Sequence, residues 1–221
     1  MIGSFQAINI GQGDNNALGQ TGKIYSEAQA PGLTRQSSFL ESGGYLQFDW
    51  RNAGSEPTRG GFYKAEYSVF SGLDLARIDF NKLDLVAQQY VPLFNDKRVF
   101  ALQGTTTLTD AHRGSSVPFY LQPIVGGAET LRGFRPFRFY DDNSVVLNGE
   151  YRFEASSSLD IAIFADAGKV FHRWEQWNLH GLQSDVGFGL RFKAQQRLAM
   201  RIDTAFSHEG VQVWFRFRNV F

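Results

Sequence analysis

The chain has 221 residues, with 22 basic and 22 acidic side chains and no cysteine. The balanced charge gives no support for nucleic acid as a partner, and the missing cysteines exclude disulfides and thiolate metal sites. The four histidines, His112, His172, His180 and His208, are scattered without ligand spacing, so we expect neither a metal site nor a cofactor. No apolar run approaches the roughly 20 residues of a membrane-spanning helix.

Alternation of apolar and polar residues runs through most of the chain and predicts β-strands. About ten segments show this pattern, each near the length of a tilted membrane strand. They cover residues 4–11, 44–52, 60–70, 82–93, 98–109, 145–153, 159–168, 185–193, 198–206 and 211–221. The sequence therefore predicts an all-β fold of antiparallel strands.

The clearest alternation lies in residues 198–206. Its predicted apolar face consists of Leu198, Met200, Ile202, Thr204 and Phe206. Its predicted polar face consists of Ala199, Arg201, Asp203 and Ala205. A strand with one apolar and one charged face is expected to separate two different environments.

The connections between the strands alternate in length. Short turns are expected near residues 95–97, 156–158 and 195–197. Long connections are expected at 11–40, about 71–80, 110–143 and 172–183. Short turns on one side and long loops on the other are typical of an outer-membrane barrel.

Periodicity alone does not decide which face points outward. A soluble β-barrel that binds an apolar ligand would turn the apolar face inward, whereas a membrane barrel would turn it toward lipid. Gly187 and Gly189 on a polar face favour a crowded barrel interior, and the chain ends on a strand whose last residue is Phe221. Aromatic residues near strand ends suit interfacial girdles; they are Tyr45, Trp50, Tyr63 and Tyr151.

The stretch "GGAETLRGFRPFRF", residues 126–139, breaks the alternation with paired glycines and three arginines. An arginine-rich loop in an arbitrary protein is usually a solvated surface loop. Here, Glu150 and Asp166 fall on the polar faces of the next two predicted strands. If those strands are neighbours, an inward-folded Arg132 could bridge both carboxylates, which favours a paired guanidinium over a lone buried charge.

Residues 120–221 resemble the C-terminal barrel of the BamA/TamA-type outer-membrane protein assembly factors, also called the bacterial surface antigen family. The matching pieces are "GGAETLRGF", "GEYRF", "FADAGKVF", "VGFGLRF" and the terminal aromatic strand. "DWRNAGSEPTRGGFY" and "QQYVPL" are similar to the preceding part of that barrel. The resemblance covers most of the chain and is weakest over residues 1–38.

The resemblance implies that the loop at 110–143 folds back into the barrel lumen. Arg132 would then pair with Asp166 and with Glu150, as an internal latch. Gly133 would permit a tight backbone course, and Phe134 would wedge against the barrel wall. Phe164 and Gly168 complete the family's strand motif around Asp166.

The last strand resembles the family's terminal β-signal, which assembly machinery reads by strand addition. The residues that fit are Val213, Phe215, Phe217 and Phe221. Asn219 departs from the pattern, because an apolar residue is more usual there. The alternative is that these side chains simply face lipid.

The resemblance implies a non-enzymatic factor that inserts proteins into the bacterial outer membrane. Its partners would be membrane lipid, nascent outer-membrane proteins and lipoproteins of an assembly complex. Family barrels have sixteen strands preceded by POTRA domains, so we expect residues 1–221 to be the C-terminal ten strands without a POTRA domain. Residues 1–40 would hold the first of these strands and a long extracellular loop. A two-partner-type secretion channel or a passive pore remains an alternative.

Overall fold

The computed structural model describes residues 2–11, 21–33, 37–54, 56–73, 78–94, 97–178, 180–194 and 197–217. Ten strands form one antiparallel sheet in which neighbours in sequence, apart from the loop strands β6 and β7, are neighbours in space. Their bounds are β1 Ile2–Ile8, β2 Ser37–Asp49, β3 Gly60–Gly72, β4 Asp79–Leu93, β5 Arg98–Ala111, β8 Asn143–Ser156, β9 Leu159–Phe171, β10 Gln183–Ala194, β11 Arg197–Ser207 and β12 Gly210–Phe217. The all-β antiparallel prediction is confirmed.

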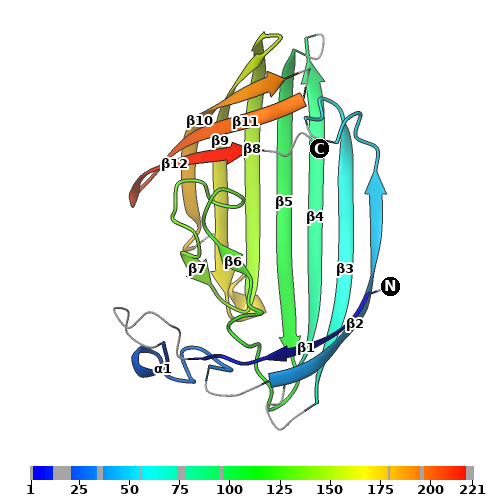
Figure 1. The fold of residues 1–221 in the computed structure, drawn as a ribbon, viewed down its shortest axis with the longest axis vertical. Helices are drawn as coiled ribbons and strands as arrows, with labels where there is room; N and C mark the ends of the chain where they lie inside the picture. Colours follow the sequence, from blue (N-terminus) through cyan, green and yellow to red (C-terminus); the bar gives the residue numbers. More distant parts are fainter. Residues whose placement is uncertain are drawn as a thin grey trace.

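The sheet curls into the wall of an open barrel (Figure 1). Strands β3, β4 and β5 run along the long axis, whereas β10, β11 and β12 tilt across it. The long β5–β8 connection begins at the lower end of this view, whereas the short β8–β9 turn lies at the upper end. The remaining elements are β6 Ile124–Val125, β7 Phe139–Tyr140, helix α1 Thr21–Ile24 and a 3-10 turn at Trp174–Gln176.

Helices contribute little to the fold. None of those in the described residues is long and apolar enough to cross a membrane.

The two faces of the sheet have the burial pattern of a membrane barrel. On the convex side, Leu46 and Phe215 expose 75% and 63% of their surface. On the concave side, Arg191 and Asp203 are fully buried at 0%. A soluble β-barrel would show the reverse, because its charges face water and its apolar face forms the core.

An apolar cluster fills the concave side at the long-loop end. Phe39, Phe70, Ile78 and Phe80 pack there with Val117 from the long loop. Two ring pairs stabilise the cluster, because Phe70 lies 5.7 Å from Phe39 and stacks on Phe80 at 4.4 Å. The interior is therefore polar only over part of its height.

The expected loop at 11–40 is too long, because β2 already begins at Ser37. The segment 37–43 is polar enough to look like a loop. However, it pairs with β1 on one side and β3 on the other, and Phe39 anchors it in the apolar cluster. The expected loop at about 71–80 is also shorter, since β3 ends at Gly72 and β4 starts at Asp79.

Leu198 faces the interior, and its assignment to the outward face is wrong. The β10–β11 ladder shifts register between Phe192 and Lys193, which pair with Met200 and Leu198. Residue 199 is the extra residue of this β-bulge, and a bulge reverses the facing of residues beyond it. Leu198 is consequently buried, on the same side as Lys193.

Gly187 and Gly189 lie where the interior is crowded. A Cβ on Gly189 would stand 2.2 Å from Asp203 Oδ1 and 2.3 Å from a guanidinium nitrogen of Arg191. A Cβ on Gly187 would stand 2.4 Å from the Phe164 ring. These positions accept only glycine because larger neighbouring side chains occupy the space.

Candidate functional site: the loop inside the barrel

The connection between β5 and β8, residues 112–142, folds against the concave side of the sheet. Its short strands β6 and β7 pair with each other and lie against β8 and β9 (Figure 1). Val125, Leu131 and Phe134 of this loop pack on Val146 of β8. Their burial fixes the loop to the wall by apolar contact.

Two adjacent glycines form the turn that precedes the three arginines of the loop, Arg132, Arg135 and Arg138. Gly126 and Gly127 have φ angles of +116° and +100°, which side chains disfavour. The Gly127 amide donates to the carbonyls of Leu131 and Phe134, both at 3.1 Å. This turn directs Arg132 toward the sheet.

Arg132 binds two carboxylates inside the barrel. Its Nε and Nη2 donate to the two oxygens of Asp166 at 2.7 Å and 2.8 Å. Its Nη1 donates to Glu150 Oε2 at 2.7 Å. All three residues are buried. The bidentate geometry is the strongest form of arginine–carboxylate pairing, so the loop is held to β8 and β9 by charge as well as by packing.

The Arg132 guanidinium stays charged in this position. Burial acts to lower the pKa of Arg132, but hydrogen bonds and charge from Asp166, together with the charge of Glu150, outweigh it and raise that pKa. A permanently charged guanidinium between two carboxylates is a stable ion-pair arrangement when every charge is partnered.

Glu150 is the centre of a larger cluster. Besides Arg132, the Glu150 carboxylate forms ion pairs with three more arginines: Arg152 at 2.9 Å, Arg191 at 2.9 Å and Arg201 at 3.4 Å. Arg191 and Arg201 also pair with Asp203, at 2.7 Å and 2.5 Å. The sequence did not identify these arginines as part of the site. Their alternation on polar faces was the available signal, but the partners depend on strand register and curvature.

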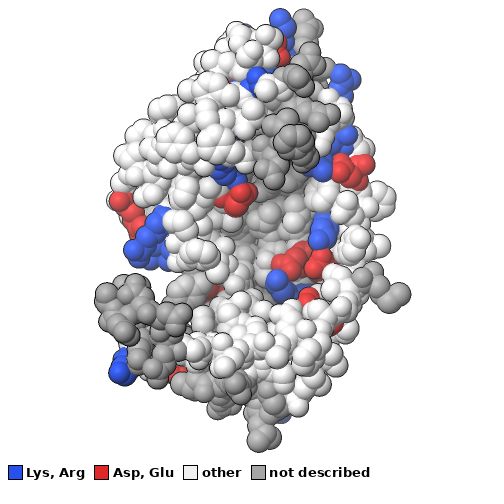
Figure 2. Space-filling model, viewed as in Figure 1, with Lys and Arg blue, Asp and Glu red and all other residues white. Residues whose placement is uncertain are grey.

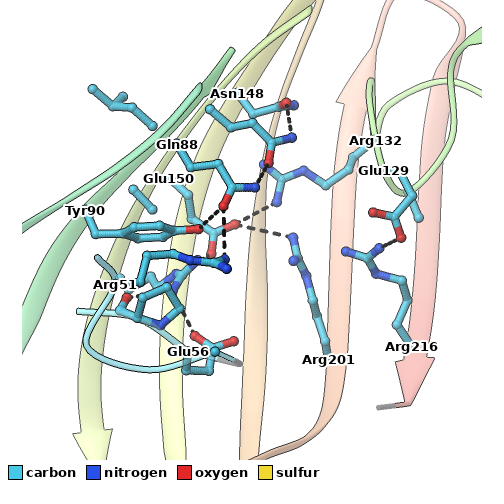
Figure 3. A pocket seen from close by; sticks show the side chains of 17 residues that line it. Arg51, Glu56, Gln88, Tyr90, Glu129, Arg132, Asn148, Glu150, Arg201 and Arg216 are labelled. Carbon is cyan, nitrogen blue, oxygen red and sulfur yellow. Dashed lines mark hydrogen bonds and ion pairs between the residues drawn. The ribbon is translucent and has the colours of Figure 1, made fainter. Parts of the chain in front are cut away.

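Figure 3 shows part of this cluster, with Glu150, Arg132 and Arg201, lining a polar cavity of about 220 Å³. Arg132 and Arg201 both point toward Glu150, and Arg216 reaches Glu129 of the loop. In Figure 2, acidic and basic side chains gather within the hollow of the molecule. Loop and ion pairs together occupy the part of the interior that a wide pore would leave to water.

Phe164 and Gly168 flank Asp166 on β9 and face the interior with it. The Phe164 ring lies beneath Arg132, with the guanidinium carbon 3.4 Å from the ring centroid. Gly168 lies close to β8, because a Cβ there would stand 2.9 Å from the Val145 carbonyl oxygen. Both residues therefore shape the surface on which the loop rests.

Gly133 and Phe134 follow Arg132 into the interior. Gly133 is needed for space, and its φ is not in the positive region: a Cβ there would stand 2.4 Å from Asp185 Cβ. The tight backbone course expected of Gly133 belongs to Gly126 and Gly127 instead. Phe134 is fully buried, edge-on to Phe139 at 5.2 Å and to His208 at 5.4 Å.

The loop also contacts the last two strands. The Trp214 indole N–H donates to the Arg132 carbonyl at 2.6 Å, and the Ser207 hydroxyl donates to the Gly133 carbonyl at 2.8 Å. Arg138 pairs with Glu209 in the β11–β12 turn at 2.7 Å. The hydrogen bond from Arg138 lowers the pKa of Glu209. The loop thus joins β8 and β9 to β11 and β12, which the sequence did not predict.

His172 does not stand alone, although the sequence spacing suggested it. Its Nδ1 lies 2.7 Å from Asp142 Oδ2, and Asp141 belongs to the same group of oxygen and nitrogen atoms within 4.8 Å. Gln122 also donates to Asp142, at 2.8 Å. These contacts form a polar cluster at the base of the loop.

The expected terminal signal is described only in part. Val213, Phe215 and Phe217 lie exposed on the outer face of β12. Phe221 lies outside the described residues. An exposed apolar row on a barrel's outer face is the position of lipid-facing side chains.

Comparisons with known proteins identify the family and the fold. The model of a family described as the Omp85 superfamily domain matches residues 10–218. The crystal structure of BamA from Haemophilus ducreyi lacking POTRA domains 1–3 has the same fold, with a TM-score of 0.68 and 18% sequence identity. The match covers 83% of this chain and 42% of that one, so this chain spans less than half of that structure. A search of curated proteins finds no match.

Proposed function

The chain belongs to the Omp85 superfamily, and on that premise we propose that it forms part of a barrel that inserts proteins into the outer membrane. It is a bacterial outer-membrane β-barrel protein from a family of insertion and transport proteins. Of these two activities, protein insertion and protein transport, we assign insertion to this protein. Its partners would be nascent outer-membrane proteins, lipid and the lipoproteins of an assembly complex.

The observation that carries the proposal is the occupied interior. Arg132 ties the loop to Glu150 and Asp166 across a cluster of buried ion pairs. A passive pore needs an open water-filled lumen, as in large porins. An insertion factor has no such need, because its substrates enter the membrane along the barrel wall. A two-partner-type secretion channel would share this loop, so the experiment below separates it from an insertion factor.

The mechanism would use backbone hydrogen bonding and no covalent chemistry. Within the described residues, β12 pairs only with β11. The N–H and C=O groups on its other edge can accept an incoming strand, as in β-augmentation. Each strand added would then leave its own edge for the next, so that backbone groups remain paired as they enter lipid.

Within this mechanism, the loop would hold the last strands in position beside the open edge of β12. It contacts β8 and β9 through Arg132, and β11 and β12 through Ser207 and Trp214. These tethers would fix the tilt of the last strands while the edge of β12 stays available. The exposed apolar side chains of β12, among them Val213 and Phe217, would keep that edge at lipid depth.

The test reconstitutes the full-length protein that contains this chain into liposomes. We expect it to accelerate the folding of an added unfolded outer-membrane protein relative to empty liposomes, and to give little steady conductance in planar bilayers. A secretion channel or passive pore, the second candidate, would give the opposite pair of results. Steady conductance without accelerated folding would overturn the proposal.

A further inference from the structure

Asp185 is a buried carboxyl group that the latch does not use. It lies on β10 directly opposite Asp166 of β9. Only 3% of the residue is exposed, and both carboxylate oxygens are buried without a hydrogen-bond partner among the described residues. A buried polar group with no partner is uncommon and calls for a physical explanation.

The groups that face Asp185 offer no spare cation. From β9 it faces Asp166, which already receives Arg132 and, at 2.8 Å, the Asn148 amide. From the loop it faces Gly133 and Arg132, whose guanidinium is directed to Asp166 and Glu150. From β11 it faces Ser207, whose hydroxyl donates to the Gly133 carbonyl.

An ionised Asp185 would be costly here. Burial of a carboxylate without donors is strongly unfavourable, and a second carboxylate directly opposite adds repulsion. A protonated Asp185 avoids both effects, because it is neutral and its hydroxyl can donate to Asp166. The loop covers this pair, since Gly133 packs directly on the Asp185 side chain.

We propose that Asp185 is a proton-binding site that couples loop docking to pH. With the loop docked over it, Asp185 carries a proton. Loss of that proton places an unpaired charge beneath Gly133, which favours release of the loop and rehydration of the carboxylate. Docking therefore tightens as pH falls and loosens as pH rises. This inference rests on the proposed role of the loop as a lumenal latch.

The test measures loop mobility. Its result therefore does not depend on whether the protein accelerates folding in the insertion assay. The chain has no cysteine, which allows one nitroxide label on Arg135→Cys, an exposed loop position. The labelled full-length protein is followed by electron paramagnetic resonance in liposomes from about pH 5 to about pH 9. An ordinary exposed Asp does not titrate there, because its reference pKa is about 3.9. One proton changes the ratio of released to docked loop by up to about tenfold per pH unit.

Two variants assign the titrating group. Asp185→Asn copies the neutral acid and can still donate to Asp166, so we expect a docked loop that no longer responds to pH. Two histidines also contact the loop, His208 through Phe134 and His172 through Asp142, so both need a control. The double variant His172→Asn/His208→Asn should keep the pH response. A pH-independent parent, a responsive Asp185→Asn or an unresponsive double histidine variant would each overturn the proposal.

Discussion

The guanidinium carbon of Arg132 lies 3.4 Å from the centroid of the Phe164 ring. Across the β9–β10 ladder, Phe164 is paired with Gly187, where a Cβ would stand 2.4 Å from the ring. Arginine, aromatic ring and glycine thus form one stack from loop to wall. Gly187 leaves space for the Phe164 ring, and the ring stabilises the buried guanidinium by a cation–π interaction.

This stack explains why the loop residue and the strand motif occur together. Asp166 binds the edge of the guanidinium while Phe164 contacts its plane. An arginine satisfies both because its charge is planar and delocalised, whereas a lysine ammonium cannot make the bidentate contact. Lysine at position 132 is therefore expected to be a poor replacement.

Replacing Arg132 by Ala should release the loop. The change leaves Glu150 and Asp166 without their shared cation, and removing one partner of a buried ion pair typically costs about 3–5 kcal/mol. We expect faster proteolysis by chymotrypsin within residues 126–140 of the folded barrel. Arg135→Ala is the matched control, because it removes an arginine from the same loop at an exposed position. Equal cleavage of the two variants would contradict the latch.

The contact between Arg132 and Asp166 should appear as non-additivity. We expect the effect of Arg132→Ala combined with Asp166→Asn on loop release to be smaller than the sum of the single effects. Residues in direct contact commonly show coupling energies of about 0.5–3 kcal/mol. Protease-monitored opening of the four proteins gives the coupling. A strictly additive result would mean that the two side chains act independently.

Gly133→Ala should also loosen the loop, although it changes no charge. The added Cβ would stand 2.4 Å from Asp185 Cβ and 3.0 Å from Ser207 Cβ. Overpacking of this kind typically costs about 1–3 kcal/mol. Gly44→Ala on β2 is the control, since a Cβ there meets nothing within 4 Å. If both variants show the parent's rate of loop cleavage, the close approach of Gly133 to Asp185 is not present.

A charged residue in the middle of a strand, on the outward face, should destabilise the barrel. Ile163 on β9 is 58% exposed, and in a soluble protein an exposed Ile→Arg change is nearly neutral, within about 0.5 kcal/mol. On a lipid face, arginine at the bilayer midplane costs about 2–4 kcal/mol. We expect Ile163→Arg to lower the free energy of unfolding in liposomes by that amount. Leu73→Arg, just beyond β3, should cost much less; equal small effects would argue against lipid contact.

The tether between Arg138 and Glu209 should weaken in acid. The hydrogen bond from Arg138 lowers the pKa of Glu209, so the pair stabilises the docked loop above the ordinary pKa of Glu, about 4.3. That contribution is lost as pH falls through the lowered pKa. The Nε–H resonance of Arg138 in micelles should broaden there, and Glu209→Gln should remove the change. A resonance unaffected by acid would exclude the tether.

The positions of the main latch residues followed from local pattern and resemblance. Period-two alternation places Glu150 and Asp166 on polar faces because successive strand residues point to opposite sides. The arginine-bearing loop suggested Arg132 as a bridge between them, and the resemblance implied the same pairing. Neither source predicted that Glu150 also binds Arg191 and Arg201, because those contacts depend on the curvature that brings β8 near β10 and β11.

Two errors have the same physical origin. The regular alternation of Leu198 with Met200 predicts an outward Leu198, but a bulge at residue 199 inverts its facing. The polar composition of segment 37–43 predicts a loop, yet pairing with β1 and β3 makes it a strand. In both cases long-range pairing overrides the local pattern.

The all-β class, the succession of strands along the chain and the two-faced character of each strand follow from the amino-acid sequence. These properties are local, since they depend on residue type and a repeat of two. The tertiary structure alone decided which face is buried, which cations surround Glu150, and that Asp185 lies unpartnered beneath Gly133. Such relationships depend on register and curvature, which arise from hydrogen bonding between segments distant in the chain.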